Sequence, residues 1–219
     1  MRILPLARIF SLITLGLAAV IAWPVLAAQP LALTFATHAA FFSEETHQPK
    51  PLDPQVFVRV ADAAEAAGPQ GIHHMAGFEP ALLSDAPGTP LFSAAGKPLG
   101  FALGEWLAAK GTVTISELPS GGARIVAHFT GLRPNGSYSL FENHFDQQPV
   151  GFTPIDGTGK HNSFRATRNG TATVTVTAPL MLTHANAVLL VYHSDAKAHG
   201  ESRGDPGATA HHQLIARLP

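Results

Sequence analysis

The sequence predicts an all-β protein: an antiparallel, Greek-key-type sandwich or barrel with an irregular, partly helical N-terminal extension. From about residue 100 onward, short segments alternate apolar and polar residues, which is the period of a half-buried strand. Turn signals such as Asn135-Gly136 and Asn169-Gly170 separate these segments. The 20 glycines and 18 prolines favour many further turns. Short strands separated by polar turns are typical of sandwiches and barrels.

Residues 1–28 have the pattern of a secretory signal peptide. Arg2 and Arg8 form a positive start, Ile9 to Ala22 form an apolar stretch, and small residues follow up to Ala27 and Ala28. We expect cleavage near Ala27 and Ala28 and export of the mature chain to the periplasm or beyond the cell. The alternative is an uncleaved membrane anchor, which the interruptions of the apolar stretch disfavour (Ser11, Thr14 and Pro24).

The mature chain would carry little charge and no basic stretch. The full sequence has 14 Lys and Arg against 15 Asp and Glu, so removing two arginines leaves 12 against 15, a formal charge of −3. We therefore expect no nucleic-acid partner, and no membrane contact after signal cleavage. The sequence has no cysteine, which excludes disulfides and cysteine-based metal sites or nucleophiles.

Residues 29–98 are expected to form the irregular N-terminal extension and to pack on the main domain. One helix is predicted inside it, with Asp53 as cap and Pro54 at the first helical position. Apolar residues then recur at helical spacing until Gly68 and Pro69 end the pattern (Phe57, Val60, Ala64 and Ala67). The adjacent pair His73 and His74 lies in a glycine-flanked loop, where solvated histidines are commoner than metal ligands.

Residues 99–219 are predicted to form the β-sandwich domain, and the strands follow in order. In the first two strands, and in a later one, apolar residues take the inward-facing positions (Val113 and Ile115; Ile125, Ala127 and Phe129; Ala172, Val174 and Val176). The outward-facing positions between them are polar, apart from Val126. After a turn at residues 131–136, Tyr138, Leu140 and Glu142 share one strand face, while Ser139 and Phe141 share the other.

The segment from Val188 to Tyr192 is apolar on both faces. Such a strand is predicted to be central and covered on both sides. The cover is either the N-terminal extension or a second copy of the chain, so the segment also predicts a possible homo-oligomer.

Histidines concentrate in the tail, from residue 185 to residue 218. His193 and Asp195 end the apolar strand, His199 lies in the following loop, and His211 and His212 open the last strand pattern. Two paired strands would bring these side chains together, with His144 and Asp146 as further members. Strict alternation places His212 on the face of Leu214, Ala216 and Leu218, and leaves His211 toward solvent or a loop pocket.

Three interpretations of this cluster stay open. Copper or zinc needs three or four converging imidazoles or carboxylates, which His144, His193, His199, His211, His212 and Asp195 can supply. The second interpretation is a hydrogen-bonded structural cluster, with Ser194 and Arg203 bracing the loop. The third is acid–base catalysis, for which no catalytic residue can be named. The spacing matches no compact zinc motif, and no cofactor other than a metal is indicated.

The segments GTVTISELPSGGARIVAHFTGLRPNGSYSLFENHFD (residues 111–146), NGTATVTVT and AVLLVYHSD together resemble copper/zinc superoxide dismutases. The resemblance implies a β-sandwich in which His193 matches a late copper ligand and His161 falls near the last zinc histidine. The positions of two copper histidines hold Ser139 and Phe141, and Phe164 stands where a zinc aspartate is expected. The family's disulfide cannot form here. The resemblance therefore implies the fold without a competent dismutase.

These observations lead to three functional hypotheses. The first is an exported β-sandwich protein that binds copper or zinc at the histidine-rich loop and is not a competent dismutase. The second is a superoxide dismutase-like metalloenzyme with a relocated ligand set. The third is a metal-free structural or interaction module. Metal content separates the first two from the third.

Overall fold

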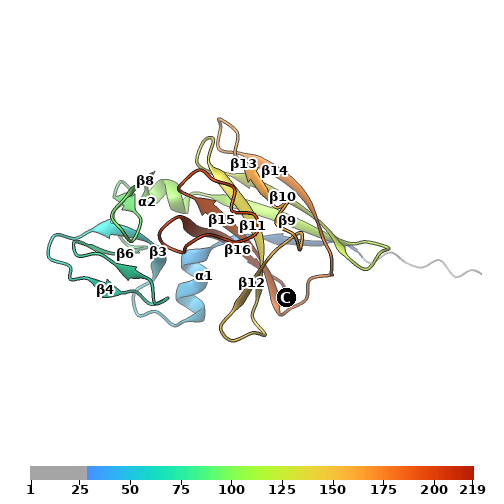
Figure 1. The fold of residues 1–219 in the computed structure, drawn as a ribbon, viewed down its shortest axis with the longest axis horizontal. Coiled ribbons are helices and arrows are strands. Elements are labelled where there is room, and N and C mark those ends of the chain that lie inside the picture. Colours follow the sequence, from blue (N-terminus) through green and yellow to red (C-terminus); the bar gives the residue numbers. More distant parts are fainter. Residues whose placement is uncertain (1–28) are drawn as a thin grey trace, which may run out of the picture.

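The structure is a computed structural model that describes residues 29–219, so the predicted signal peptide lies outside the described residues. Across residues 29–219, strands make up 45% of the residues and helices 7%, in several antiparallel sheets that do not close into a barrel, which confirms the all-β prediction. Within residues 29–219, no helix is both long enough and apolar enough to span a membrane. Figure 1 shows two long sheets packed together, with a smaller sheet at one end.

The first sandwich sheet has the strand order β1-β9-β10-β14. Its members are β1 (Leu31–Thr34), β9 (Lys110–Glu117), β10 (Ala123–Thr130) and β14 (Ala172–Ala178). The predicted alternation is observed, because Ala127 pairs with Val113 on one side and with Val174 on the other, and all three are buried.

The second sandwich sheet has the order β12-β11-β15-β16-β2, with β13 also paired to β11. Its members are β11 (Ser137–His144), β12 (Gly151–Pro154), β13 (Ser163–Arg165), β15 (Asn186–His193), β16 (Ala210–Arg217) and β2 (Ala36–Thr37). Strand β15 lies in the middle, and every one of its residues is buried. The prediction of a central strand covered on both sides is confirmed.

The two sheets enclose the main core. Ile115, Ile125 and Val176 of the first sheet pack in one cluster with Leu140 and Leu190 of the second, and all are at most 3% exposed. A fully buried Leu or Ile side chain contributes roughly 1.5–3 kcal/mol relative to an exposed one. With no disulfide available, this apolar interior is the main source of stability.

The other face of the second sheet, here called the outer face, is covered by helix α1 (His38–Glu45) and by the loop after β11. Phe141, Leu189, Val191 and Ile215 form a smaller apolar cluster there. The hydroxyl of Thr37 accepts a hydrogen bond from the Ala40 amide at 3.3 Å and so caps the helix. The outer cover of β15 is therefore supplied by α1 of the N-terminal segment together with the loop after β11. A homo-oligomer through this strand stays a prediction that a solution mass measurement would test.

Residues 29–98 contribute edge strands to both sandwich sheets, since β1 pairs with β9 and β2 pairs with β16. The rest forms a sheet of order β6-β3-β7-β8 and a two-stranded sheet of β4 with β5. The bounds are β3 (Leu52–Arg59), β4 (Ala66–Ala67), β5 (His73–His74), β6 (Phe78–Leu82), β7 (Pro90–Phe92) and β8 (Pro98–Ala102), followed by α2 (Leu103–Leu107).

The helix predicted from Asp53 to Ala67 is wrong, because Leu52–Arg59 is strand β3. The Asp53 side chain does accept a hydrogen bond from the Gln55 amide, as a cap would, but the chain continues extended. Val56, Phe57 and Val58 are all buried, which a strand covered on both faces allows and an amphipathic helix does not. Pro54 is tolerated because the pairing with β6 is irregular between Leu52 and Phe57.

Candidate functional site: the histidines of the second sheet

The structure separates the predicted site residues into several small groups. His193, Asp195 and His199 lie together at the end of β15, His211 and His212 lie on opposite faces of β16, and His144 ends β11. Within residues 29–219, no three His, Asp or Glu side chains are placed so that they can hold a metal ion together. Asp146 is exposed and hydrogen-bonds to none of the predicted site histidines in that range. The six predicted residues therefore do not form one site.

His193 is 1% exposed on the outer face of β15. Its Nε2 lies 2.8 Å from the hydroxyl of Ser139 on β11, and that hydroxyl lies 3.0 Å from Ser163. The Nδ1 atom of His193 is buried and has no hydrogen-bond partner within the described chain. Burial, followed by the neighbouring His199, lowers the pKa of His193 to about 4. The ring is therefore neutral near pH 7.

His199 faces His193 from the loop after β15, and the two ring centroids are 5.0 Å apart. Its Nε2 lies 2.8 Å from Oδ2 of Asp195, an acceptor that requires the proton of a neutral His199 on that nitrogen. Asp195 also accepts from the Lys197 amide at 3.1 Å. Partial burial acts to raise the pKa of Asp195, but the His199 hydrogen bond and the Lys197 amide outweigh it and hold the pKa below its usual range.

His211 is fully buried beside Trp106, with ring centroids 6.5 Å apart. Its Nδ1 donates to the carbonyl of Gln55 at 2.9 Å, and its Nε2 lies 3.2 Å from the Ser194 hydroxyl. Burial lowers the pKa of His211 to about 4. Both ring nitrogens thus have hydrogen-bond partners. Through them His211 connects β16 to strand β3 and to the loop that follows β15.

His212 lies on the outer face, next to α1. The Nη1 group of Arg203 donates to Nε2 of His212 at 3.2 Å, and Nδ1 of His212 lies 3.4 Å from Nε2 of His38. Burial, then the neighbouring His38 and Arg203, lowers the pKa of His212 well below its usual value. His38 escaped notice in the sequence because its partner is 174 residues away and no local pattern marks it.

The faces predicted for His211 and His212 are wrong. Leu190 pairs with Leu214, but the next residue, Val191, pairs with His212, so Gln213 is an extra residue in β16. Such a bulge reverses the side-chain alternation before it. His211 therefore lies on the inner side with Tyr192 and Trp106, and it is buried instead of facing solvent.

The remaining predicted residues have structural partners. His144 has its Nε2 2.8 Å from the Thr153 hydroxyl and its Nδ1 3.3 Å from the Asn186 amide. His73 is exposed as expected, but His74 is only 4% exposed and its ring centroid is 5.4 Å from that of Phe57. The prediction that both are solvated is therefore wrong for His74. The interpretation as a hydrogen-bonded cluster accounts for His144 and His211.

A buried carboxyl group lies close to this network and was not predicted as such. Asp53 is fully buried and accepts from the indole of Trp106 at 2.8 Å and from the Gln55 amide at 2.9 Å. Burial raises the pKa of Asp53 to about 6, against the lowering effect of these hydrogen bonds. Asp53 thus supports the segment whose Gln55 carbonyl receives His211.

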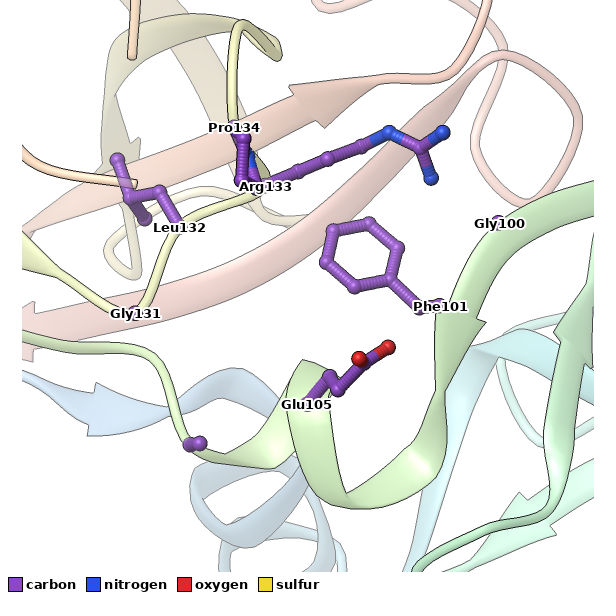
Figure 2. A pocket seen from close by; sticks show the side chains of 8 residues that line it. Gly100, Phe101, Glu105, Gly131, Leu132, Arg133 and Pro134 are labelled. Atoms are coloured by element: carbon purple, nitrogen blue, oxygen red, sulfur yellow. The ribbon is translucent and has the colours of Figure 1, made fainter. Parts of the chain in front are cut away.

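Two cavities bear on binding. Figure 2 shows the first, about 460 Å³, where the Arg133 side chain extends toward Gly100 above Phe101. Its polar groups already have partners: Arg133 donates to the Leu99 carbonyl, and Glu105 accepts from the Ala102 amide. The second, here called the α1 pocket, has about 400 Å³ between α1 and the outer face. It contains buried polar atoms without partners.

Comparison of the sequence with protein-family models and with curated proteins finds no match. Function therefore has to be inferred from the chemistry of these residues.

Proposed function

We propose that the chain is an exported metal-binding protein that holds a copper or zinc ion between His193 and His199, and that it acts by binding and not as a dismutase. The observation that carries the proposal is the buried Nδ1 of His193, which has no hydrogen-bond partner although its ring is 5.0 Å from that of His199. A buried polar atom without a partner costs about 1–3 kcal/mol, and a bound ion would remove that cost.

Hydrogen bonds orient both rings in the manner of metal ligands. Asp195 accepts a hydrogen bond from the Nε2–H of His199, which leaves the lone pair of His199 on Nδ1. The hydroxyl of Ser139 lies beside Nε2 of His193 and can accept a hydrogen bond from its N–H, which leaves the lone pair of that ring on the unpartnered Nδ1. Carboxylate or hydroxyl partners that fix the ring and its tautomer are the usual second layer of a histidine metal site.

The number of donors decides which ion fits. Two imidazoles leave a tetrahedral zinc ion short of two ligands, which water would have to supply. Copper(I) accepts fewer ligands and is held well by imidazole, so it is the ion we expect to bind more tightly. Ser139 and Phe141 cannot replace the imidazoles of a dismutase copper centre, since Phe141 packs in the outer-face cluster.

The test is a metal titration of the mature protein, with copper(I) under anaerobic reducing conditions and zinc in a separate series. We expect a single bound copper(I) ion per chain, in competition with a chromophoric copper(I) chelator. His199→Ala should abolish this binding. Asp195→Ala should weaken it by about 10–100-fold, because it removes only the partner that orients His199.

His161→Ala is the matched control, since His161 is an exposed loop histidine and, within residues 29–219, forms no hydrogen bond with His193 or His199. It should bind copper(I) as the unchanged protein does. No bound metal after incubation with either ion would leave the metal-free structural module. Superoxide turnover by the copper-loaded protein would instead favour the dismutase-like enzyme.

A further inference from the structure

The α1 pocket is a separate site on the outer face of the second sheet. Its floor comes from Asn143 on β11 and His212 on β16, and His38 of α1 closes one side. Half-buried phenylalanines form its walls, among them Phe145 and Phe152. A cavity of about 400 Å³ with apolar walls and a few buried polar groups has the size and character of a small-molecule site.

A chain of hydrogen bonds fixes which nitrogen of His38 carries the proton. Arginine can only donate, so Nε2 of His212 accepts from Arg203 and the His212 proton lies on Nδ1. That proton is donated to Nε2 of His38 at 3.4 Å. His38 is neutral because burial lowers its pKa to about 3, so its own proton lies on Nδ1. The Nδ1–H of His38 is buried and has no acceptor within residues 29–219.

Asn143 supplies the complementary group. Its side chain is 4% exposed, and its Oδ1 atom is buried without a hydrogen-bond partner in the described chain. Leaving a buried donor and a buried acceptor both unsatisfied is rare in folded proteins, and each costs about 1–3 kcal/mol. His38 and Asn143 both line the α1 pocket. A ligand that accepts from the one and donates to the other would satisfy both.

The walls favour a flat aromatic body. The guanidinium of Arg217 lies 3.7 Å from the ring centroid of Phe145, and that of Arg203 lies 3.4 Å from the centroid of Phe152. Both rings line the pocket, where they can contact a planar molecule. Glu45 and Arg217 also line the pocket, but the two groups that the ligand would contact, on His38 and Asn143, are neutral. An uncharged ligand therefore avoids the cost of burying an unpaired charge beside them.

We propose that the α1 pocket binds an uncharged, planar aromatic molecule that carries a primary or secondary amide. The amide carbonyl accepts from Nδ1–H of His38, and the amide N–H donates to Oδ1 of Asn143. The ring system lies against Phe145 and Phe152. This site uses none of the residues proposed to hold the metal ion, so either proposal stands without the other.

The experiment uses two ligands that differ in one donor. 2-Naphthamide carries both the carbonyl and the N–H, whereas 2-acetylnaphthalene keeps the carbonyl and the ring system but has no N–H. Titration calorimetry on the mature protein should show 2-naphthamide binding about tenfold more tightly, the effect of one buried hydrogen bond. Equal affinity for the two ligands, or no binding of 2-naphthamide at 1 mM, would overturn the proposal.

Asn143→Leu identifies the acceptor. It should lower the affinity for 2-naphthamide by about tenfold and leave the affinity for 2-acetylnaphthalene unchanged, so that the two ligands bind equally tightly. The variant should fold with unchanged or higher thermal stability, because it removes an unsatisfied buried oxygen. Lower stability with an unchanged ligand preference would show that Asn143 has a structural partner instead, and would sink the proposal.

Gln213→Leu is the matched control. Gln213 also has a buried amide oxygen without a partner, but it does not line the α1 pocket, and its Nε2 donates to the Trp106 carbonyl at 3.0 Å. It should lower stability while keeping the tenfold preference for 2-naphthamide. Phe41→Ala, in a wall of the pocket, should weaken both ligands to the same extent. A wall variant without effect on either ligand would place the binding elsewhere.

Discussion

The two faces of the second sandwich sheet differ in chemistry although they belong to the same strands. Toward the first sheet, Leu140, Val188 and Leu190 lie in an extended apolar cluster. Toward α1, Leu189 and Val191 lie in a small cluster whose neighbours include the buried rings of His193 and His212. The inner face is a closed apolar core, and the outer face is a thin apolar layer interrupted by polar side chains.

The difference extends to unsatisfied polar atoms. Four buried side-chain atoms lack a hydrogen-bond partner in residues 29–219, and three of them belong to His38, Asn143 and His193 on the outer side. Such atoms lower stability, and they persist where a ligand or ion supplies the missing partner. We therefore propose that the inner face serves stability and the outer face serves binding.

The largest effect we expect is a loss of stability as pH falls, caused by buried histidines on both faces. Unfolded histidines take up a proton below pH 6.5, whereas His38, His193 and His211 have pKa values of about 3, 4 and 4 in the fold. Between pH 6.5 and 4 the unfolded state thus binds more protons, and stability falls as pH falls by up to about 1.4 kcal/mol per pH unit for each histidine. Asp53 opposes this, because its raised pKa of about 6 makes the folded state the better proton binder between pH 6 and 3.8.

Urea unfolding at several pH values measures this slope. His211→Leu should reduce it by the contribution of one histidine, and Asp53→Asn should make it steeper between pH 6 and 4. A free energy of unfolding that is constant from pH 7 to pH 4 would contradict the neutral, buried state of these rings.

The next effect compares neighbouring residues on β15 that point to opposite faces. Leu190→Ala opens a cavity in the closed core and should cost about 4 kcal/mol. Leu189→Ala should cost about 2–3 kcal/mol, because Phe41, Phe145 and Phe152 beside it are only partly buried and can move into the space. Both are 0% exposed, so burial alone predicts no difference. Equal losses in denaturant unfolding would show that the outer face is packed as tightly as the inner one.

The smallest effect concerns the support behind His211. Trp106→Phe removes the indole N–H that donates to Asp53, and should lower the free energy of unfolding by about 2 kcal/mol at pH 7. The loss in the free energy of unfolding should be smaller at pH 4.5. At that pH Asp53 is protonated, so the indole N–H donates to a neutral carboxyl group and not to a carboxylate. A loss independent of pH would mean that the ring packing of Trp106, and not its hydrogen bond, matters.

Much of the sandwich could be predicted because its strands carry their own signal. In β14 the apolar residues Ala172, Val174 and Val176 alternate with threonines, and that period is fixed by the backbone of a strand. The signal failed for β3, where burial on both faces leaves no alternation and a cap-like Asp53 and Pro54 imitate a helix start. The histidine-rich tail was identified, but its expected convergence into one site of three or more ligands was not observed within residues 29–219.

The sequence by itself determined the all-β class, the central place of β15 and the concentration of histidines beside it, because each depends on local composition and period. Tertiary structure alone decided which histidines meet. The bulge at Gln213 exchanges the faces on which His211 and His212 lie, and α1 brings His38 to a partner 174 residues away. Local sequence encodes neither, since a bulge depends on the partner strand and a contact between distant segments depends on the whole packing.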